Sequence, residues 1–279
     1  MKILVVGMGL IGGSICKALK KYTDNEVYGS NRSESKLKLA LADGAIDGIG
    51  NIAEEDYDVI WMCMYKEALE KLIKENAPKL KKGTIIADVC GLKGKMTENM
   101  SDYCEQFGVH YVGTHPMAGK EKNGYAYSDA DMFKNCNFIL SPTDSTNSEA
   151  METIKNLALA MGAGNIVYSS PEEHDRMIAY TSHIPHIIAG SYVSNELVEK
   201  ANDFGGGSFR DVSRVATMDA GMWAELFLDN RDAVLEQIAI FKKNIEEYES
   251  AIRTENRIAL EAIIGKSRLS KEIQIKSKS

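Results

Sequence analysis

Near its start the chain reads Lys2-Ile3-Leu4-Val5-Val6-Gly7-Met8-Gly9-Leu10-Ile11-Gly12. Residues 2–6 form a short, mostly apolar run, which is typical of a parallel strand buried on both faces. After the glycines, Ile11, Ile15 and Leu19 recur every four residues, a spacing that predicts a helix with one face on a sheet. A strand that leads directly into a helix begins a βαβ unit, so this opening predicts an α/β fold.

The same alternation continues along the first 168 residues. Apolar runs predict further strands at residues 26–29, 59–64, 84–87, 110–112, 137–140 and 165–168. Helical patterns lie between them at residues 33–41, 67–73, 93–107 and 148–161. This rhythm predicts a doubly wound, Rossmann-type and mostly parallel sheet. Long helical segments follow from about residue 170, so we expect a dinucleotide-binding domain over residues 1–169 and an all-α domain over residues 170–279.

The composition argues against several classes of partner. Lys and Arg number 33 and Asp and Glu 40, so the net charge of -7 gives no footprint for nucleic acid or an anionic membrane. The five cysteines include no C-x-x-C pair, so we expect reduced thiols and no metal site. No apolar run approaches the roughly 18 residues of a membrane span, and the chain does not begin like a signal peptide. We therefore expect a cytoplasmic protein.

Residues 7–12 match the pattern G-x-G-x-x-G between a predicted strand and a predicted helix, where that pattern has physical meaning. The glycines allow a tight turn and a close approach of the backbone to a pyrophosphate, whose charge then faces the helix N-terminus. The predicted cofactor-binding residues of this loop are Gly7, Gly9, Leu10, Ile11 and Gly12.

The end of the second predicted strand bears on the choice of cofactor. An NAD-binding chain usually carries an acidic residue there, which holds the ribose 2′-hydroxyl. This chain instead reads Ser30-Asn31-Arg32, a set of donors suited to a 2′-phosphate, so we favour NADP over NAD. The alternative is that Ser33 only caps the following helix and that Arg32 is solvated.

Four further segments form a set of motifs that is specific as a combination. They are residues 113–119 (Gly-Thr-His-Pro-Met-Ala-Gly), 172–175 (Glu-Glu-His-Asp), 182–186 (Ser-His-Ile-Pro-His) and 205–214 (Gly-Gly-Gly-Ser-Phe-Arg-Asp-Val-Ser-Arg). In this order, behind the N-terminal glycine motif, they resemble the prephenate/arogenate dehydrogenase family across nearly the whole chain. The resemblance implies oxidative decarboxylation of prephenate to 4-hydroxyphenylpyruvate in tyrosine biosynthesis, with reduction of NADP or NAD.

The resemblance also assigns roles to single residues. It makes His115 the catalytic histidine, and a neutral histidine suits a base that takes the proton of the substrate's ring hydroxyl. It makes Arg214 the anchor of a substrate carboxylate and places His183 near the substrate side chain. Arg210 lies four residues before Arg214 and either supports it or pairs with Asp211.

Other positions receive structural interpretations or depart from the family. We interpret His174 as structural and His186 as a packed or helix-positioning residue, and a solvated loop position is favoured for Glu121 over a gate of the pocket. Many family members carry a serine where this chain has Gly91. The hydroxyl that would hold the catalytic histidine or the substrate hydroxyl is therefore absent, and water, backbone or another side chain must supply that contact.

Three alternative functions remain open. Arogenate would give tyrosine directly by the same chemistry, and one buried acidic group near His183 would favour it. A β-hydroxyacid dehydrogenase would need a catalytic lysine on the helical domain. A nicotinamide-binding sensor without turnover would lack the base or the anion anchor.

A stripe of apolar residues bears on assembly. Residues 234, 238, 241, 245, 248 and 252 alternate spacings of four and three, which predicts one long helix with an apolar seam. That seam either packs on its own domain or joins two copies, and the family resemblance favours a homodimer through the C-terminal helices. Because 279 residues leave no room for an added regulatory domain, we expect any inhibition by tyrosine to be competitive.

Overall fold

The computed structural model describes residues 1–52, 54–120 and 122–276, so Glu121 lies outside the described residues. The chain forms two compact units, Met1–Ile178 and Ala179–Ser279. In the described ranges, every helix is too short or too polar to traverse a lipid bilayer.

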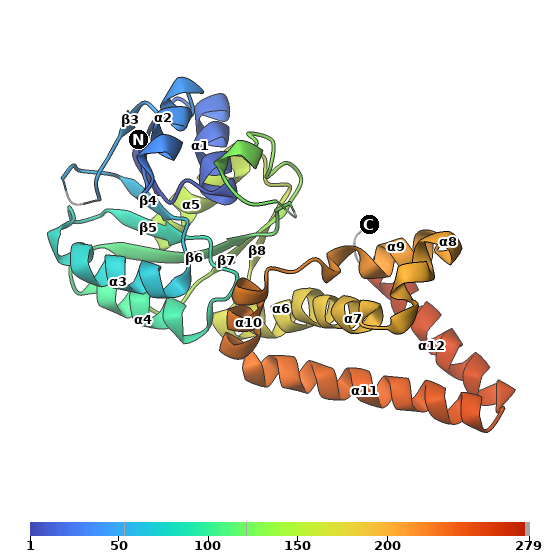
Figure 1. The fold of residues 1–279 in the computed structure, drawn as a ribbon. Helices are drawn as coiled ribbons and strands as arrows, with labels where there is room; N and C mark the ends of the chain where they lie inside the picture. The colour runs from blue at the N-terminus through green and yellow to red at the C-terminus, as the bar shows by residue number, and fades with distance from the viewer. Residues whose placement is uncertain (53, 121, 277–279) are drawn as a thin grey trace. The chain divides into compact units, whose positions relative to one another are not determined.

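The first unit is built on a sheet with strand order β3-β2-β1-β4-β5-β6-β7-β8 (Figure 1). Its strands are β1 (Lys2–Val6), β2 (Glu26–Ser30), β3 (Gly48–Ile49), β4 (Val59–Met62), β5 (Ile85–Asp88), β6 (His110–Pro116), β7 (Asn137–Ser141) and β8 (Asn165–Tyr168). Neighbouring strands are parallel throughout, except that β6 and β7 are antiparallel. The sequence order reverses between β1 and β4, which is where doubly wound sheets open a crevice for a ligand.

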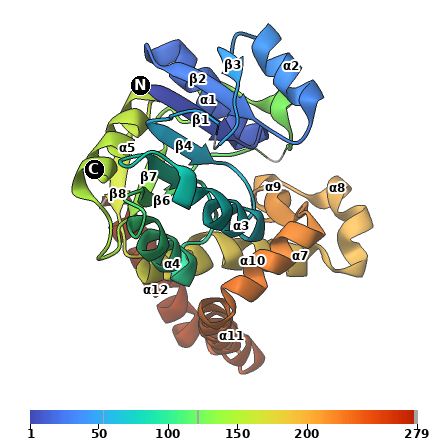
Figure 2. The ribbon, with the colours of Figure 1, turned by 90° about the vertical axis from the view of Figure 1, so that its left-hand side faces the viewer.

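Helices cover both faces of this sheet, because side chains of a strand alternate between faces. On one face, α1 (Leu10–Tyr22), α2 (Glu34–Ala42) and α5 (Ser148–Ala160) share a core with Ile3 and Val5. On the other, α3 (Lys66–Asn76) and α4 (Gly94–Glu105) pack beside each other on Leu4 and Val6 (Figure 2). The short helix α6 (Pro171–Ile178) packs on α4. The expected Rossmann-type, mostly parallel sheet is confirmed.

Strand β6 is longer than the sequence predicts. Residues 110–112 pair in parallel with β5, and the next four residues pair antiparallel with β7, with His115 opposite Ile139. The predicted end at residue 112 is therefore wrong, because pairing with β7 keeps the backbone extended past the glycine at position 113. The sequence placed His115 in a segment after the strand, whereas the structure places it within β6.

The second unit is helical. It contains the π-helical turn η3 (Ala179–His183), α7 (Ile184–Val193), η4 (Glu196–Lys200), α8 (Ala201–Phe204), α9 (Gly207–Ser213), η5 (Arg214–Ala216), α10 (Ala220–Asp229), α11 (Arg231–Arg253) and α12 (Arg257–Lys276). Helix α7 packs on α9, and α11 packs on α12. The predicted apolar stripe lies on α11, where Val234 is buried while Ile245 and Ile252 are 49% and 62% exposed. The stripe is therefore buried within the unit at its Val234 end and exposed at its Ile252 end.

Candidate active site

The glycine loop joins β1 to α1 at the carboxyl edge of the sheet. Gly7 has φ +102°, a conformation that L side chains rarely adopt, and a Cβ there would lie 2.2 Å from the carbonyl oxygen of Cys63. A Cβ on Gly12 would lie 2.0 Å from the carbonyl oxygen of Gly7. Only glycine fits either position, because strand, loop and helix approach at backbone distance.

Gly9 has a different environment, which is the one a bound phosphate requires. It is the N-cap of α1, and a Cβ there would meet no described atom within 4 Å. Among the described residues, no side chain caps α1, and its first turn, which includes Leu10 and Ile11, carries no acidic residue. The helix N-terminus therefore offers backbone N–H groups to an anion, so these residues fit the pyrophosphate of a dinucleotide.

The segment after β2 braces this loop. The Asn31 side-chain oxygen accepts the Met8 N–H at 3.1 Å, and its amide nitrogen donates to the Ser33 carbonyl at 3.2 Å. The Ser30 carbonyl accepts the Gly7 N–H at 2.8 Å. Arg32 is exposed and makes no hydrogen bond or ion pair within the described ranges. Ser33 stands at the N-cap of α2, but its hydroxyl contacts Ser35 and makes no capping bond.

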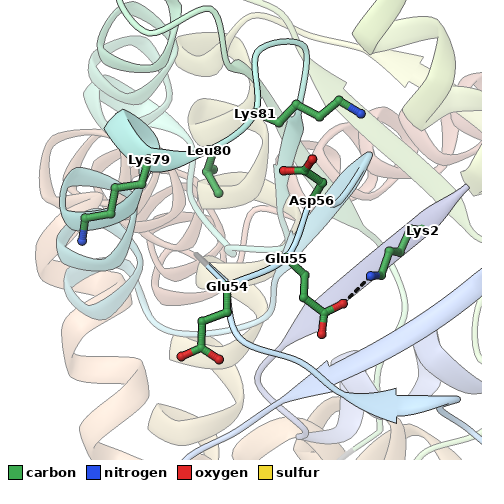
Figure 3. A pocket seen from close by; sticks show the side chains of 7 residues that line it. All are labelled: Lys2, Glu54, Glu55, Asp56, Lys79, Leu80 and Lys81. Carbon is green, nitrogen blue, oxygen red and sulfur yellow. Dashed lines mark hydrogen bonds and ion pairs between the residues drawn. The ribbon is translucent and has the colours of Figure 1, made fainter.

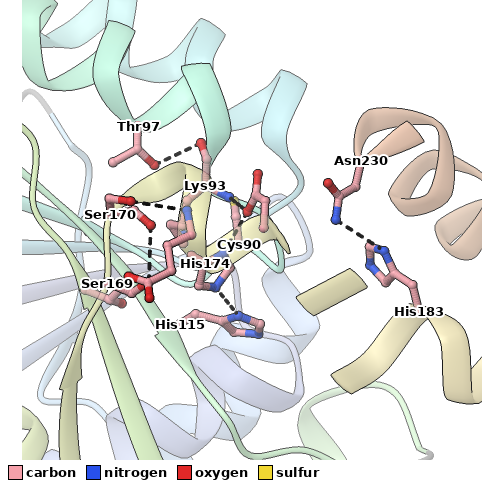
Figure 4. A network of polar contacts seen from close by, with 12 residues as sticks. Cys90, Lys93, Thr97, His115, Ser169, Ser170, His174, His183 and Asn230 are labelled. Carbon is pink, nitrogen blue, oxygen red and sulfur yellow. Dashed lines mark hydrogen bonds and ion pairs between the residues drawn. The ribbon is translucent and has the colours of Figure 1, made fainter. Parts of the chain in front are cut away.

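His115 lies near the carboxyl end of β6 and is partly buried. Its Nδ1 lies 2.9 Å from Nε2 of His174, which is 1% exposed and comes from α6 (Figure 4). Nδ1 of His174 in turn lies 2.7 Å from Oδ1 of Asp175. Two imidazoles and a carboxylate thus form a continuous chain that ends at His115.

A buried ion pair holds the backbone beside His115 and the carboxylate of Asp175. Asp88 ends β5 and pairs with Lys93, and both side chains are fully buried. Asp88 also accepts the N–H of Thr114 at 3.0 Å, next to His115 in β6. The Lys93 N–H donates to Oδ1 of Asp175 at 2.8 Å. Asp88 at the end of β5 therefore holds the strand of His115, and its ion-pair partner Lys93, at the N-cap of α4, holds the carboxylate of Asp175.

The second unit carries His183 and His186. His183 is 1% exposed, makes edge-to-face contacts with Trp223 and Phe227, and has Nδ1 3.4 Å from the Asn230 amide nitrogen (Figure 4). His186 stacks on Trp223 with ring centroids 3.8 Å apart, and its Nδ1 lies 2.8 Å from the Ser182 carbonyl. His186 is thus a packed residue, as the sequence predicts.

The two arginines lie at the end of α9. Arg214 is the C-cap residue, and its N–H donates to the Arg210 carbonyl, so the two are one helical turn apart as expected. Both are exposed. In the part of the chain that the structure describes, Arg210 makes no ion pair with Asp211, so that alternative finds no support.

Comparison with known proteins decides the family. Residues 15–167 match the family model "Prephenate dehydrogenase, nucleotide-binding domain", and residues 170–266 match "Prephenate dehydrogenase, dimerization domain". The chain belongs to the prephenate dehydrogenase family. It is therefore a dehydrogenase whose first half is a nucleotide-binding domain, as the sequence predicts.

Individual relatives agree with this assignment. The chain is 33% identical to prephenate dehydrogenase of Bacillus subtilis (strain 168) over 91% of this chain and 71% of that protein. It is 31% identical to cyclohexadienyl dehydrogenase of Zymomonas mobilis over 91% of this chain and 89% of that protein. A solved structure of prephenate dehydrogenase from A. aeolicus with hydroxyphenyl propionate and NAD+ has a TM-score of 0.84 and 28% identity, covering 100% of this chain and 97% of that one.

One contact of this prephenate dehydrogenase family member goes beyond what its sequence predicts. His174, interpreted from the sequence as structural, is 1% exposed, and its ring contacts that of His115. The segment Glu-Glu-His-Asp already contained the signal, because a histidine next to an aspartate is a usual means of orienting a second group. The serine hydroxyl that many family members carry is absent at Gly91, and here the side chain of His174 contacts the ring of His115 instead.

A polar hollow lies at the opposite edge of the sheet. Lys2, at the start of β1, lines it together with residues 54–56 and 79–81 (Figure 3). Its three lysines and three carboxylates balance in charge, and Lys2 pairs with Glu55. The hollow lies away from the glycine loop, because β1 runs from Lys2 at one edge to Val6 at the other.

Proposed function

We propose that this chain oxidises and decarboxylates prephenate to 4-hydroxyphenylpyruvate with reduction of NADP or NAD. The observation that carries the proposal is the position of His115. It is partly buried near the carboxyl end of β6, the edge at which the glycine loop follows β1, and a buried imidazole holds its ring. Ligands of doubly wound sheets bind at this edge.

The chemistry asks for one base and one anion anchor. His115 accepts the proton of the ring hydroxyl while the carbon that bears it becomes a carbonyl. A dinucleotide held at the glycine loop would supply the acceptor for the hydride that this carbon gives up. Loss of CO2 then leaves an aromatic ring, and its formation favours the forward direction.

The substrate is a dianion, so a protein of net charge -7 must bind it with local cations. We assign Arg214 to one carboxylate, with Arg210 one turn away as its support. We assign His183 to the keto-acid side chain. Its burial and its contacts with Trp223 and Phe227 keep its ring in one orientation.

The described residues of the second unit favour prephenate over arogenate. Arogenate carries an ammonium group that a buried carboxylate would recognise. The buried polar side chains described in this unit are His183 and Asn230, and neither is acidic. The similarity to a cyclohexadienyl dehydrogenase keeps arogenate as the second candidate.

For the cofactor we favour NADP over NAD. Arg32 is exposed at the end of β2, with its guanidinium available for a 2′-phosphate. Ser30 lies beside it, whereas the side chain of Asn31 is engaged in bracing the glycine loop. Asn31 therefore contributes to the site by holding the loop.

Assembly and location complete the proposal. We infer a homodimer through the C-terminal helices, supported by the match of residues 170–266 to a dimerization domain and by the exposed part of the apolar stripe. We place the functional division at residues 1–169 and 170–279, between the two matched models. All five cysteines are free thiols, which supports a cytoplasmic location.

The test combines both substrates with both cofactors. Purified protein receives prephenate or arogenate with NADP or NAD, and reduced nicotinamide is followed by absorbance. We expect the highest kcat/KM with prephenate and NADP. A higher value with arogenate would reverse the substrate assignment, a higher value with NAD would reverse the cofactor assignment, and no turnover in any combination would reject the proposed function.

A further inference from the structure

The hydrogen bonds of Asp175, His174 and His115 fix where the protons of the two rings lie. Oδ1 of Asp175 accepts the backbone N–H of Lys93 at 2.8 Å, so this oxygen acts as an acceptor. The same oxygen lies 2.7 Å from Nδ1 of His174. An ionised carboxylate can only accept, so Nδ1 of His174 must carry the proton.

The position of the proton on His174 determines the position of the proton on the ring of His115. A neutral His174 with its proton on Nδ1 presents a lone pair at Nε2, and this atom lies 2.9 Å from Nδ1 of His115. Two lone pairs cannot form a hydrogen bond, so Nδ1 of His115 must be the donor. The neutral ring of His115 then has its lone pair on Nε2.

We propose that His174, oriented by Asp175, is a positioning residue that holds His115 in the tautomer with a basic Nε2. The inference rests on the proposed function in that it names the atom of His115 that takes the substrate proton. When Nε2 accepts this proton, His115 becomes a cation that donates from Nδ1 to His174, and the Asp175 carboxylate at the end of the chain favours that charge.

Burial gives this arrangement its stability. His174 is 1% exposed and its side chain is fully buried, so water competes little for either of its nitrogens. Both ends of this series of hydrogen-bonded groups are held by the buried Asp88–Lys93 pair, because Asp88 accepts the N–H of Thr114 and the N–H of Lys93 donates to Asp175. The tautomer is thus specified before any substrate binds.

The first measurement is made on the wild-type protein without substrate, and variants serve only to assign its signals. The chain has five histidines, so ¹⁵N-labelled histidine gives a small set of ring signals that His→Gln variants assign. We expect protonated Nδ1 and unprotonated Nε2 on both His115 and His174 in the free protein at neutral pH. A proton on Nε2 of His115 would overturn the inference even if the enzyme turns over prephenate, and the expected tautomer would stand even if prephenate were not the substrate.

The second measurement is kinetic and uses paired variants. His174→Leu removes the acceptor for His115, and we expect kcat to fall about 10–100-fold with KM little changed. His174→Gln retains an oxygen that can accept from His115 and an amide that can donate to Asp175, so we expect most of the activity to return. His110→Leu is the matched control, because His110 contacts Glu105 at the opposite end of β6.

A structural role alone would give a different pattern. Loss of folding in His174→Leu would appear as a changed circular dichroism spectrum and weaker cofactor binding. In that case the activity of His174→Gln and the tautomer measured in the wild-type protein test the inference. Wild-type kcat in a folded His174→Leu variant would overturn the inference, as would equal losses in His174→Leu and His174→Gln.

Discussion

At the scale of single residues, the proposed roles separate proton transfer from charge recognition. His115 belongs to a rigid strand and is held through its ring, which suits a base that must keep one orientation. Arg214 and Arg210 are exposed at a helix end, which suits long cations that meet an incoming anion. Substitution should therefore affect the two kinds of residue in different kinetic constants.

Arg214→Ala should mainly raise the KM for prephenate and leave kcat within a few-fold, because a carboxylate anchor binds substrate and transition state alike. Steady-state kinetics at saturating cofactor measure this. Arg210→Ala is the matched control and should raise KM less. A larger effect of Arg210→Ala would exchange the two assignments, and a fall of kcat alone in Arg214→Ala would contradict its role as an anchor.

At the scale of elements, the loop between β1 and α1 carries two kinds of glycine. Gly12 is required by packing, since a Cβ would lie 2.0 Å from the Gly7 carbonyl oxygen, whereas a Cβ on Gly9 would meet no described atom within 4 Å. The first kind specifies the fold of the loop, and we propose that the second keeps the helix N-terminus open to the cofactor.

Gly12→Ala should therefore lower the free energy of unfolding by about 1–3 kcal/mol through overpacking. Gly9→Ala should keep the stability close to that of the wild type but raise the Kd of the cofactor, since its methyl group occupies the phosphate's approach. Urea denaturation and cofactor titration measure the two effects. If Gly12→Ala were as stable as the wild type, the tight approach of strand and helix would be wrong.

Local patterns predicted most elements but could not predict their long-range contacts. Period and length gave β8 at residues 165–168 and the βαβ rhythm, because those signals lie within each segment. The extension of β6 to Pro116 depends on β7, whose residues 138–141 come more than twenty positions later. Likewise, the contact of His174 with His115 joins residues 59 positions apart, so the His-Asp pair at positions 174 and 175 is visible in the sequence but the ring that His174 contacts is not.

At the scale of the molecule, the long C-terminal helices leave much apolar surface uncovered. Ile252 on α11 is 62% exposed, and Ile258 and Leu269 on α12 are 81% and 57% exposed. Apolar residues gathered in this way usually mark an interaction surface. The sequence left the stripe open between packing on its own domain and joining two copies, and the structure favours the second at the Ile245–Ile252 end.

Light scattering should give a mass of twice 30.8 kDa for the wild-type protein. Ile252→Asp should weaken the dimer, because association would bury an unpaired charge. Leu39→Asp is the matched control, since Leu39 is 54% exposed on α2 in the first unit and should not affect the mass. A wild-type mass of a single chain would refute the homodimer.

The most direct test of the account is the turnover of prephenate by wild-type protein and by His115→Asn, each at saturating substrate and cofactor. Asparagine keeps a polar side chain of similar reach but cannot act as a base, so we expect kcat to fall by about 10²–10⁴ while the Kd of the cofactor stays unchanged. Unchanged turnover in His115→Asn would contradict the assignment of His115 as the base and, with it, the central claim about this site.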